Sequence, residues 1–218
     1  MSNALIDLSH PIEEGLITYQ GLPPPVISTY LGREESRRHY AQGTEFLVGK
    51  IEMVANTGTY LDSPFHRYAE GKDLSQIPLS SLANLDGVVV RKKDPKRAID
   101  ENVFEEIDVR GKAVLIQTGW DRHWKTQQYF EGHPFLTRSA AEYLVKAGAV
   151  LIGIDSLNVD STDDPSRPVH SLLLAADILI VEHLCNLSSL PEKGFKFFAV
   201  PTMIKNFGSF PVRAFAIV

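Results

Sequence analysis

The 218-residue chain is poor in cysteine, in long apolar runs and in excess positive charge. Its one cysteine, Cys185, cannot form a disulfide within the chain or a cysteine-based zinc cluster. Because Leu184 and Leu187 flank it, we expect it to be a small buried residue. No apolar run approaches the roughly 18 residues that cross a bilayer, so no membrane partner is expected. The formal net charge of −5 gives no reason to expect a nucleic-acid partner either.

The N-terminal stretch, MSNALIDLSH, lacks the basic segment followed by an apolar core that marks a secretory signal. We therefore expect a cytoplasmic protein whose partner is a small-molecule substrate. Hydrophobic residues make up 44% of the chain and charged residues 22%, which is the ordinary balance of a globular protein. Because no repeat, low-complexity tract or linker interrupts the sequence, we expect a single domain over residues 1–218.

The apolar segments favour an α/β fold. A buried strand at residues 113–117 is followed by a helix over residues 137–146, which Gly148 ends, and by a strand at residues 149–155. A strand, a helix and a strand within about 45 residues form a βαβ pattern. Further strands are expected at residues 5–9, 46–55, 87–90, 178–182, 195–202 and 211–218, helices at residues 78–82, 100–107 (capped by Asp100) and 171–176, and an exposed loop at residues 33–38.

The stretch from residue 54 to residue 73 places Asp62 and His66 four residues apart, on either side of Pro64. Pro64 lacks an N–H and biases Ser63 away from helical geometry, so the two polar side chains do not lie one helical turn apart. We expect a strand over residues 49–55 to end and to position a rigid polar loop, which is where catalytic groups are often found. The alternative is an Asx-type turn with a surface histidine.

Two more groups of this kind lie at the ends of apolar segments. Glu182 ends the run ILIVE, where a carboxylate is costly to bury unless it is paired or bound to a cation. His170 opens a helix after the polar loop over residues 161–168. With Asp62 they form a nitrogen-and-oxygen set that suits Zn²⁺, Mn²⁺ or Fe²⁺ and leaves positions for water. A salt-bridged Glu182 and a helix-capping role near His170 are the alternatives.

The remaining candidates carry weaker signals. Tyr19 lies in the irregular segment over residues 13–25, either as a hydrophobic plug beneath a loop or as a wall of a ligand pocket. The other histidines have no partner at a recognisable ligand spacing, so we expect most of them to be at the surface or satisfied. They are His10, His39, His123, His133 and His183.

The whole chain resembles the cyclase-like metal-dependent hydrolase family, which includes bacterial kynurenine formamidase (arylformamidase) and isatin hydrolase. The family signature is His-x-Gly-Thr-His-x-Asp-x-Pro-x-His, and residues 56–66 read NTGTYLDSPFH. A second block runs from Gly153 to Asp160 and continues to His170 and Glu182 at matching spacing. The resemblance implies a swivelling β/β/α domain, with a mixed sheet and flanking helices, that forms a homodimer or a higher homo-oligomer.

The chain departs from the signature at both of its first two histidines, which are replaced by Asn56 and Tyr60. In formamidase-like members, those two imidazoles and the aspartate bind one metal, and the same aspartate binds a second metal with a distal histidine and a glutamate. Carried over, the resemblance implies that Asp62, His170 and Glu182 retain the second site and hold one divalent ion, Zn or Mn.

The resemblance also implies the roles of two further residues. His66 matches the general acid/base histidine of the family, and Tyr19 falls where the family has an aromatic residue near the substrate. We therefore expect a metal-dependent, arylformamidase-like hydrolase that cleaves a small amide, lactam, lactone or ester with metal-activated water, a reaction of tryptophan catabolism. The alternative is a catalytically impaired relative that binds a small molecule or a partner, and Asn56 and Tyr60 support it.

Overall fold

The computed structural model describes residues 4–218, so the first three residues of the N-terminal stretch lie outside it. Within that range, nine strands form one mixed sheet in the order β1-β13-β11-β5-β7-β9-β10-β4-β12. Its strands are β1 (Leu5–Asp7), β4 (Tyr60–Asp62), β5 (Leu85–Arg91), β7 (Ala113–Gln117), β9 (Leu151–Ile154), β10 (Leu179–Glu182), β11 (Lys193–Phe198), β12 (Ser209–Pro211) and β13 (Phe215–Ile217). The sequence-based expectation of an α/β fold with a mixed sheet is confirmed.

Strands β5, β7, β9 and β10 form the parallel centre of the sheet. In β7, Val114 and Ile116 pack into one core cluster, while Ala113 and Leu115 pack into the other. Successive side chains of a strand point to opposite faces, so a strand covered on both faces is apolar throughout. This explains why the run AVLI identified β7 from the sequence.

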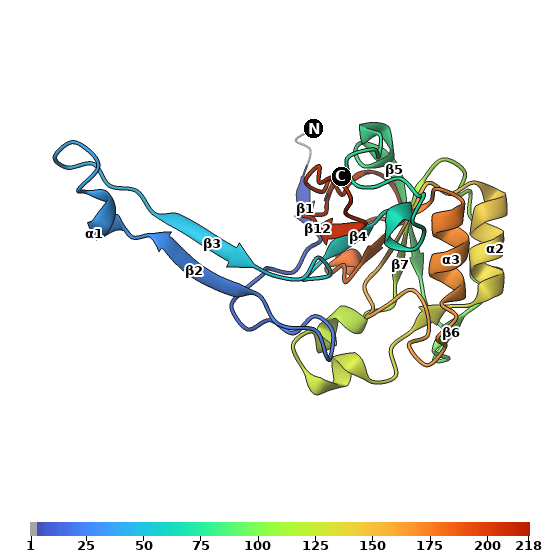
Figure 1. Ribbon diagram of the computed structural model, residues 1–218. Helices are drawn as coiled ribbons and strands as arrows, with labels where there is room; N and C mark the ends of the chain where they lie inside the picture. Colours follow the sequence, from blue (N-terminus) through green and yellow to red (C-terminus); the bar gives the residue numbers. More distant parts are fainter. Residues whose placement is uncertain (1–3) are drawn as a thin grey trace.

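Two helices cover one face of the sheet, α2 (Arg138–Ala147) and α3 (Pro168–Ala175) (Figure 1). The Thr137 hydroxyl accepts a hydrogen bond from the backbone N–H of Ala140 at the start of α2. At its end, Gly148 adopts the left-handed conformation with φ of 79°, which glycine adopts at little cost. The predicted β7–α2–β9 unit is therefore confirmed, with β7 and β9 parallel.

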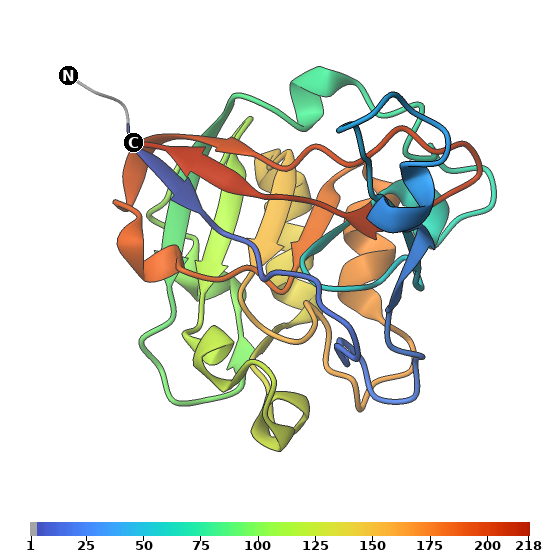
Figure 2. The same cartoon turned by 90° about the vertical axis from the view of Figure 1, so that its left-hand side faces the viewer.

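The sheet curls so that its antiparallel flank, β1, β13 and β11, closes over the core cluster that contains Ala113 and Leu115 (Figure 2). Since β1 pairs with β13, the first and last strands of the described chain lie side by side. Smaller elements complete the fold: the parallel pair β6 (Ala98–Ile99) and β8 (Phe135–Leu136), and 3-10 turns at Pro64–His66, Leu79–Ser81, Glu101–Val103, Trp120–His123, Gln127–Phe130 and Leu187–Ser189. The Asp100 side chain does not cap the turn that follows it, contrary to expectation.

An arm projects from the body of the molecule (Figure 1). It consists of the antiparallel pair β2 (Val26–Leu31) and β3 (Val48–Glu52), with α1 (Arg33–Ser36) at its tip. Two expectations are corrected here: the strand expected at residues 46–55 spans only Val48–Glu52, in the arm, and the loop expected at residues 33–38 contains α1. No helix among residues 4–218 is both long and apolar enough to cross a membrane.

Candidate functional site

The pairing of three short strands brings the polar residues of the site to one face of the sheet. Strand β4 lies between β10 and β12, with Tyr60 opposite Glu182 and Asp62 opposite Ser209. Residues directly opposite each other, and residues two apart on one strand, share a face. Asp62 is thus the last residue of a strand, which corrects the expectation that it lies in a loop after the strand at residues 49–55.

His170 reaches the same place from α3. It is the third residue of this helix, which begins at Pro168, rather than the residue that opens it. Asp160 accepts hydrogen bonds from the backbone N–H of His170 at 3.0 Å and from that of Val169 at 2.7 Å. Its Oδ2 also lies 2.7 Å from the Nδ1 of His170. Because a carboxylate only accepts, Nδ1 carries the proton in this pair, and the ring is fixed with Nε2 directed away from Asp160.

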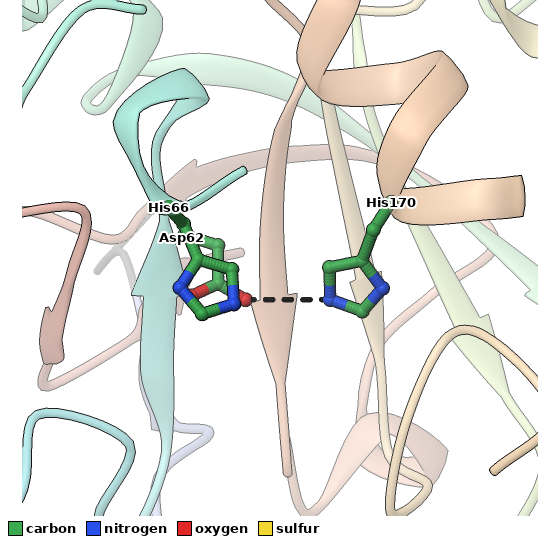
Figure 3. A group of neighbouring side chains, drawn as sticks. All are labelled: Asp62, His66 and His170. Atoms are coloured by element: carbon green, nitrogen blue, oxygen red, sulfur yellow. Dashed lines mark ion pairs between the residues drawn. The ribbon is translucent and has the colours of Figure 1, made fainter. Parts of the chain in front are cut away.

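The Nε2 atom of His170 lies between two buried carboxylates. It is 3.6 Å from Oδ2 of Asp62 and 3.7 Å from Oε1 of Glu182. Figure 3 shows the Asp62 and His170 side chains facing each other, with His66 beside Asp62. The three residues named as metal ligands from the sequence, Asp62, His170 and Glu182, therefore meet in space, although they come from β4, α3 and β10.

The electrostatics of this cluster fit a divalent cation. Asp62 and Glu182 are fully buried, and Oδ2 of Asp62 has no hydrogen-bond partner among the described residues. Burial raises the pKa of Glu182 to about 7 against the opposing effect of His170. Burial alone would lower the pKa of His170, but Asp160 and Asp62 raise it to about 10. Buried carboxylates around one imidazole thus favour a positive charge between them, and their oxygen and nitrogen donors suit Zn²⁺ or Mn²⁺.

His66 lies at the other side of Asp62, with about a third of its side chain exposed. The Ser209 hydroxyl is hydrogen-bonded to Oδ1 of Asp62 and lies 2.8 Å from Nδ1 of His66. One hydroxyl proton cannot serve both, and a carboxylate only accepts, so Ser209 donates to Asp62 and accepts from Nδ1–H of His66. The Nε2 of His66 is then free to take a proton. His66 also lies close enough to Asp62 and His170 to be a third possible ligand of one ion.

Ser209 was not among the residues expected at the site. Strand β12 reaches His66 only because Gly208 has no side chain: a Cβ there would lie 2.3 Å from the backbone N of His66. The glycine before Ser209 is the one local signal of this close approach, and it does not identify the partner. Asp160 was quoted as part of the second family block, but its role in orienting His170 was not foreseen.

The two residues that replace the signature histidines remain beside the cluster. Tyr60 donates a hydrogen bond from its hydroxyl to Oε2 of Glu182 at 2.5 Å, and Asn158 donates to the same oxygen at 3.2 Å. Burial and the Glu182 carboxylate raise the pKa of Tyr60 well above its ordinary value, so the phenol keeps its proton. Asn56 lines the cavity in front of the cluster.

A cavity of about 370 Å³ opens above these residues. Tyr19 forms part of its wall, which favours the pocket-wall interpretation over a plug beneath a loop. The Tyr19 hydroxyl is buried and has no hydrogen-bond partner among residues 4–218. The cavity is lined by Tyr19, Leu22, Asn56, Tyr60, His66, Arg67, Asn158, Pro165, Ser166, Arg167, His170 and Glu182.

A second group of histidines lies behind the cavity wall. His183 is fully buried, with Nδ1 at 2.8 Å from the Tyr129 hydroxyl, and the His10 ring stacks on Trp124 with 4.1 Å between ring centroids. The Nε2 atoms of His10 and His183 are both buried without a partner among residues 4–218. These two residues are exceptions to the expectation that most of the other histidines are at the surface or satisfied. Burial lowers the pKa of His183 to about 3 and that of His10 to about 4, so both rings are neutral.

Several known proteins are similar to this chain over nearly its whole length. Kynurenine formamidase of Geobacillus thermodenitrificans (strain NG80-2) is 32% identical over 216 residues, which cover 98% of this chain and 97% of that protein. Kynurenine formamidase of Bacillus cytotoxicus is 27% identical, with 96% and 95% covered. Isatin hydrolase A from Labrenzia aggregata, solved with benzyl benzoate bound, has the same fold, with a TM-score of 0.83 at 21% identity over 99% of this chain and 94% of that one.

A structure described as a potential metal-dependent hydrolase with cyclase activity has a TM-score of 0.82 at 24% identity, over 99% of this chain and 98% of that one. The fold inferred from the family resemblance is confirmed by these two structural matches. Residues 6–161 match the sequence model of the Cyclase family. With that match and its near end-to-end similarity to the kynurenine formamidases, this chain belongs to the Cyclase family of hydrolases.

Proposed function

We propose that this chain is a metal-dependent hydrolase that cleaves a small amide, such as an aryl formamide, or a related lactam, lactone or ester. The observation that carries the proposal is the convergence of Asp62, His170 and Glu182 beneath a cavity that His66 and Tyr19 also line. The kynurenine formamidase and isatin hydrolase relatives support the reaction class.

One divalent ion, Zn or Mn, would be held by Asp62, His170 and Glu182. The unpartnered Oδ2 of Asp62 and the free Nε2 of His170 are the donors that fit it. When bound, such an ion supplies two effects: it lowers the pKa of a coordinated water towards about 7, and it polarises a carbonyl. Asn56 and Tyr60 stand where a second site would need imidazoles, and a protonated phenol is a poor ligand, so we propose one ion per chain.

His66 is the proposed general acid and base. Ser209 fixes its tautomer, so that Nε2 can take a proton from the attacking water. As the carbon–nitrogen bond breaks, the same Nε2 returns that proton to the leaving nitrogen, which departs as a neutral amine. Tyr19 is the proposed contact for the flat part of the substrate, because its ring lies in the cavity wall.

The test combines metal analysis with hydrolysis assays. Protein purified without chelator is expected to contain about one equivalent of Zn or Mn, and to hydrolyse N-formylkynurenine or isatin. Asp62→Asn is expected to lose the metal and the activity, whereas His66→Ala is expected to keep the metal and lose roughly 100-fold or more in kcat. Metal-loaded protein that is inert on amide, lactam, lactone and ester substrates would instead favour a small-molecule-binding relative.

A further inference from the structure

The cavity has acidic residues at its base and two arginines among its other lining residues. Glu182 lines the cavity, and the fully buried Asp62 lies behind it, 3.6 Å from Nε2 of the lining residue His170. Arg67 and Arg167 come from the loop after Pro64–His66 and from the residue before α3. Among residues 4–218, neither arginine forms an ion pair with an aspartate or a glutamate.

Arg67 is held in place by contacts that leave most of its charged group free. Its Nε donates to the Ser171 hydroxyl at 3.2 Å, and its Cζ lies 5.2 Å from the centre of the Tyr68 ring. Tyr68 is itself fixed, because its hydroxyl donates to the backbone carbonyl of Ser171 at 2.8 Å. The two terminal nitrogens of Arg67 make no hydrogen bond to the described part of the chain. A guanidinium fixed at Nε presents those two nitrogens as a fork.

Arg167 is held in a backbone conformation that an ordinary residue seldom adopts. Its φ and ψ are 45° and 59°, in the left-handed region. Its Nη1 donates to Oδ1 of Asn158 at 3.4 Å and to the carbonyl of Ser161 at 3.3 Å, which leaves Nε and Nη2 without a partner among residues 4–218. A non-glycine residue held this way points to a surrounding structure that fixes the position of its side chain.

Tyr19 supplies a third donor. Its hydroxyl is buried and unpartnered in the described structure, and it lines the same cavity as the arginines. Burial and the Glu182 carboxylate raise the pKa of Tyr19. The positive charge of Arg167 and hydrogen-bonding interactions with Asn158 and Arg167 oppose that rise, so the phenol lies next to Arg167. A buried hydroxyl without an acceptor is costly, and an oxygen of a bound anion would satisfy it.

We propose that Arg67, Arg167 and the Tyr19 hydroxyl form an anion subsite, which holds a carboxylate of the substrate while its carbonyl group lies at Asp62, His170 and Glu182. This inference rests on the proposed function and names its substrate class, namely amides that carry a carboxylate. The arginines attract such a group to their own part of the cavity, away from the base where the amide is cleaved. A substrate with one carboxylate is therefore oriented, with its neutral amide towards the base.

The test compares two substrates that differ by one carboxylate, 2-formamidobenzoate and formanilide. The kcat/KM for the charged substrate is expected to exceed that for the neutral one by about tenfold or more. Arg67→Gln and Arg167→Gln are each expected to lower that ratio by roughly tenfold, chiefly through KM, and Arg→Lys at either position to restore part of it. Arg138→Gln, a matched change on the exposed face of α2, is expected to leave the ratio unchanged.

The ratio of the two kcat/KM values separates a direct role of the arginines from a structural one. Damage to the loop of Arg167 would lower kcat/KM for both substrates by the same factor and leave the ratio unchanged. An equal preference in the wild type, or a ratio that both glutamine variants leave intact, would overturn the proposal. If the protein hydrolyses neither compound, calorimetric titration with 2-aminobenzoate and aniline still tests the subsite, while the assays on lactams, lactones and esters test the proposed function. Tighter binding of 2-aminobenzoate that Arg67→Gln and Arg167→Gln weaken supports it, and equal binding in all three proteins overturns it.

Discussion

The Tyr60 hydroxyl donates to Oε2 of Glu182 at 2.5 Å across the β4–β10 pair, in which the two residues lie directly opposite each other. Tyr60 therefore replaces a signature histidine with a group that supports a carboxylate, instead of a group that binds a metal. Its hydrogen bond stabilises the ionised form of Glu182 against the burial that raises the pKa of that carboxyl. Tyr60 replaces a ligand of the family's first metal site and thus supports Glu182, a ligand of the proposed second one.

Removing this hydroxyl with Tyr60→Phe is expected to weaken metal binding. Glu182 would lose its shortest hydrogen bond, its pKa would rise further, and less of it would be ionised at neutral pH. Loss of such a supporting contact typically lowers metal affinity by about 10- to 100-fold. Competition with a chromophoric chelator measures the affinity, and Tyr143→Phe on α2 is the matched control. Unchanged or tighter binding in Tyr60→Phe would contradict this role.

Restoring both histidines tests whether their loss limits the metal content. The double variant Asn56→His with Tyr60→His is expected to bind two equivalents where the wild type binds one, because the family signature is then complete around Asp62. Elemental analysis of the two proteins, purified in parallel, gives the stoichiometry. A double variant that still folds, as judged by circular dichroism, but binds no more metal than the wild type would show that other features exclude the second ion.

Ser209 is expected to affect the reaction rather than the fold. Ser209→Ala leaves Oδ1 of Asp62 without its hydroxyl donor and frees the His66 ring to change tautomer. We expect kcat to fall roughly tenfold with little change in KM, and Ser209→Thr, which keeps the hydroxyl, to retain most of the rate. Steady-state kinetics on any substrate that the wild type hydrolyses measures both. If the alanine and threonine variants are equally impaired, packing rather than the hydroxyl is the cause.

Periodicity and caps predicted the elements that are buried on both faces. Strand β7 is apolar from Ala113 to Ile116 because helices cover one face and the curled sheet covers the other. Helix α2 carries a threonine before it and a glycine after it, and both act as expected. The same patterns made β3 longer than it is and did not show that it lies in an arm, since an apolar segment does not specify what covers it. In the arm, these side chains are exposed.

The site was less accessible to sequence reasoning. The sequence showed that Asp62, His170 and Glu182 are suitable metal ligands, and the family resemblance assigned them to one site. No local pattern, however, states which strands pair. Ser209 meets Asp62 only through the β4–β12 register, at a sequence separation of 147 residues. Arg67 and Arg167 likewise face one cavity through tertiary structure alone.

The arm gives the expected homodimer a place to form. Ile27 and Ile51 lie directly opposite each other in the β2–β3 register and are 46% and 50% exposed. An isolated two-stranded ribbon with exposed apolar side chains is marginally stable in water, so we expect a second copy of the chain to cover it. Light scattering should show a dimer for the wild type and a monomer for Ile27→Glu with Ile51→Glu, while Lys146→Glu on α2 stays dimeric. A monomeric wild type would contradict the expectation.

The buried histidines are expected to make folding sensitive to acid. Burial lowers the pKa of His133 to about 4, so in mild acid the unfolded chain takes up a proton there that the folded chain does not. Stability from this residue is therefore present above the unfolded pKa near 6.5 and is lost as pH falls towards about 4, by about 1.4 kcal/mol per pH unit. Asp155 and Glu182 act in the opposite sense, because burial raises the pKa of each to about 7.

Comparing the wild type with His133→Gln isolates the histidine from those carboxyl groups. Urea unfolding between about pH 5 and pH 7, with chelator present to remove metal linkage, gives the free energy of unfolding of both proteins. The wild type is expected to exceed the variant by a margin that shrinks as pH falls, since glutamine has no proton to gain. A constant margin would mean that His133 does not titrate differently in the two states. A margin that grows in acid would mean that the folded state holds the proton more tightly than the unfolded chain does.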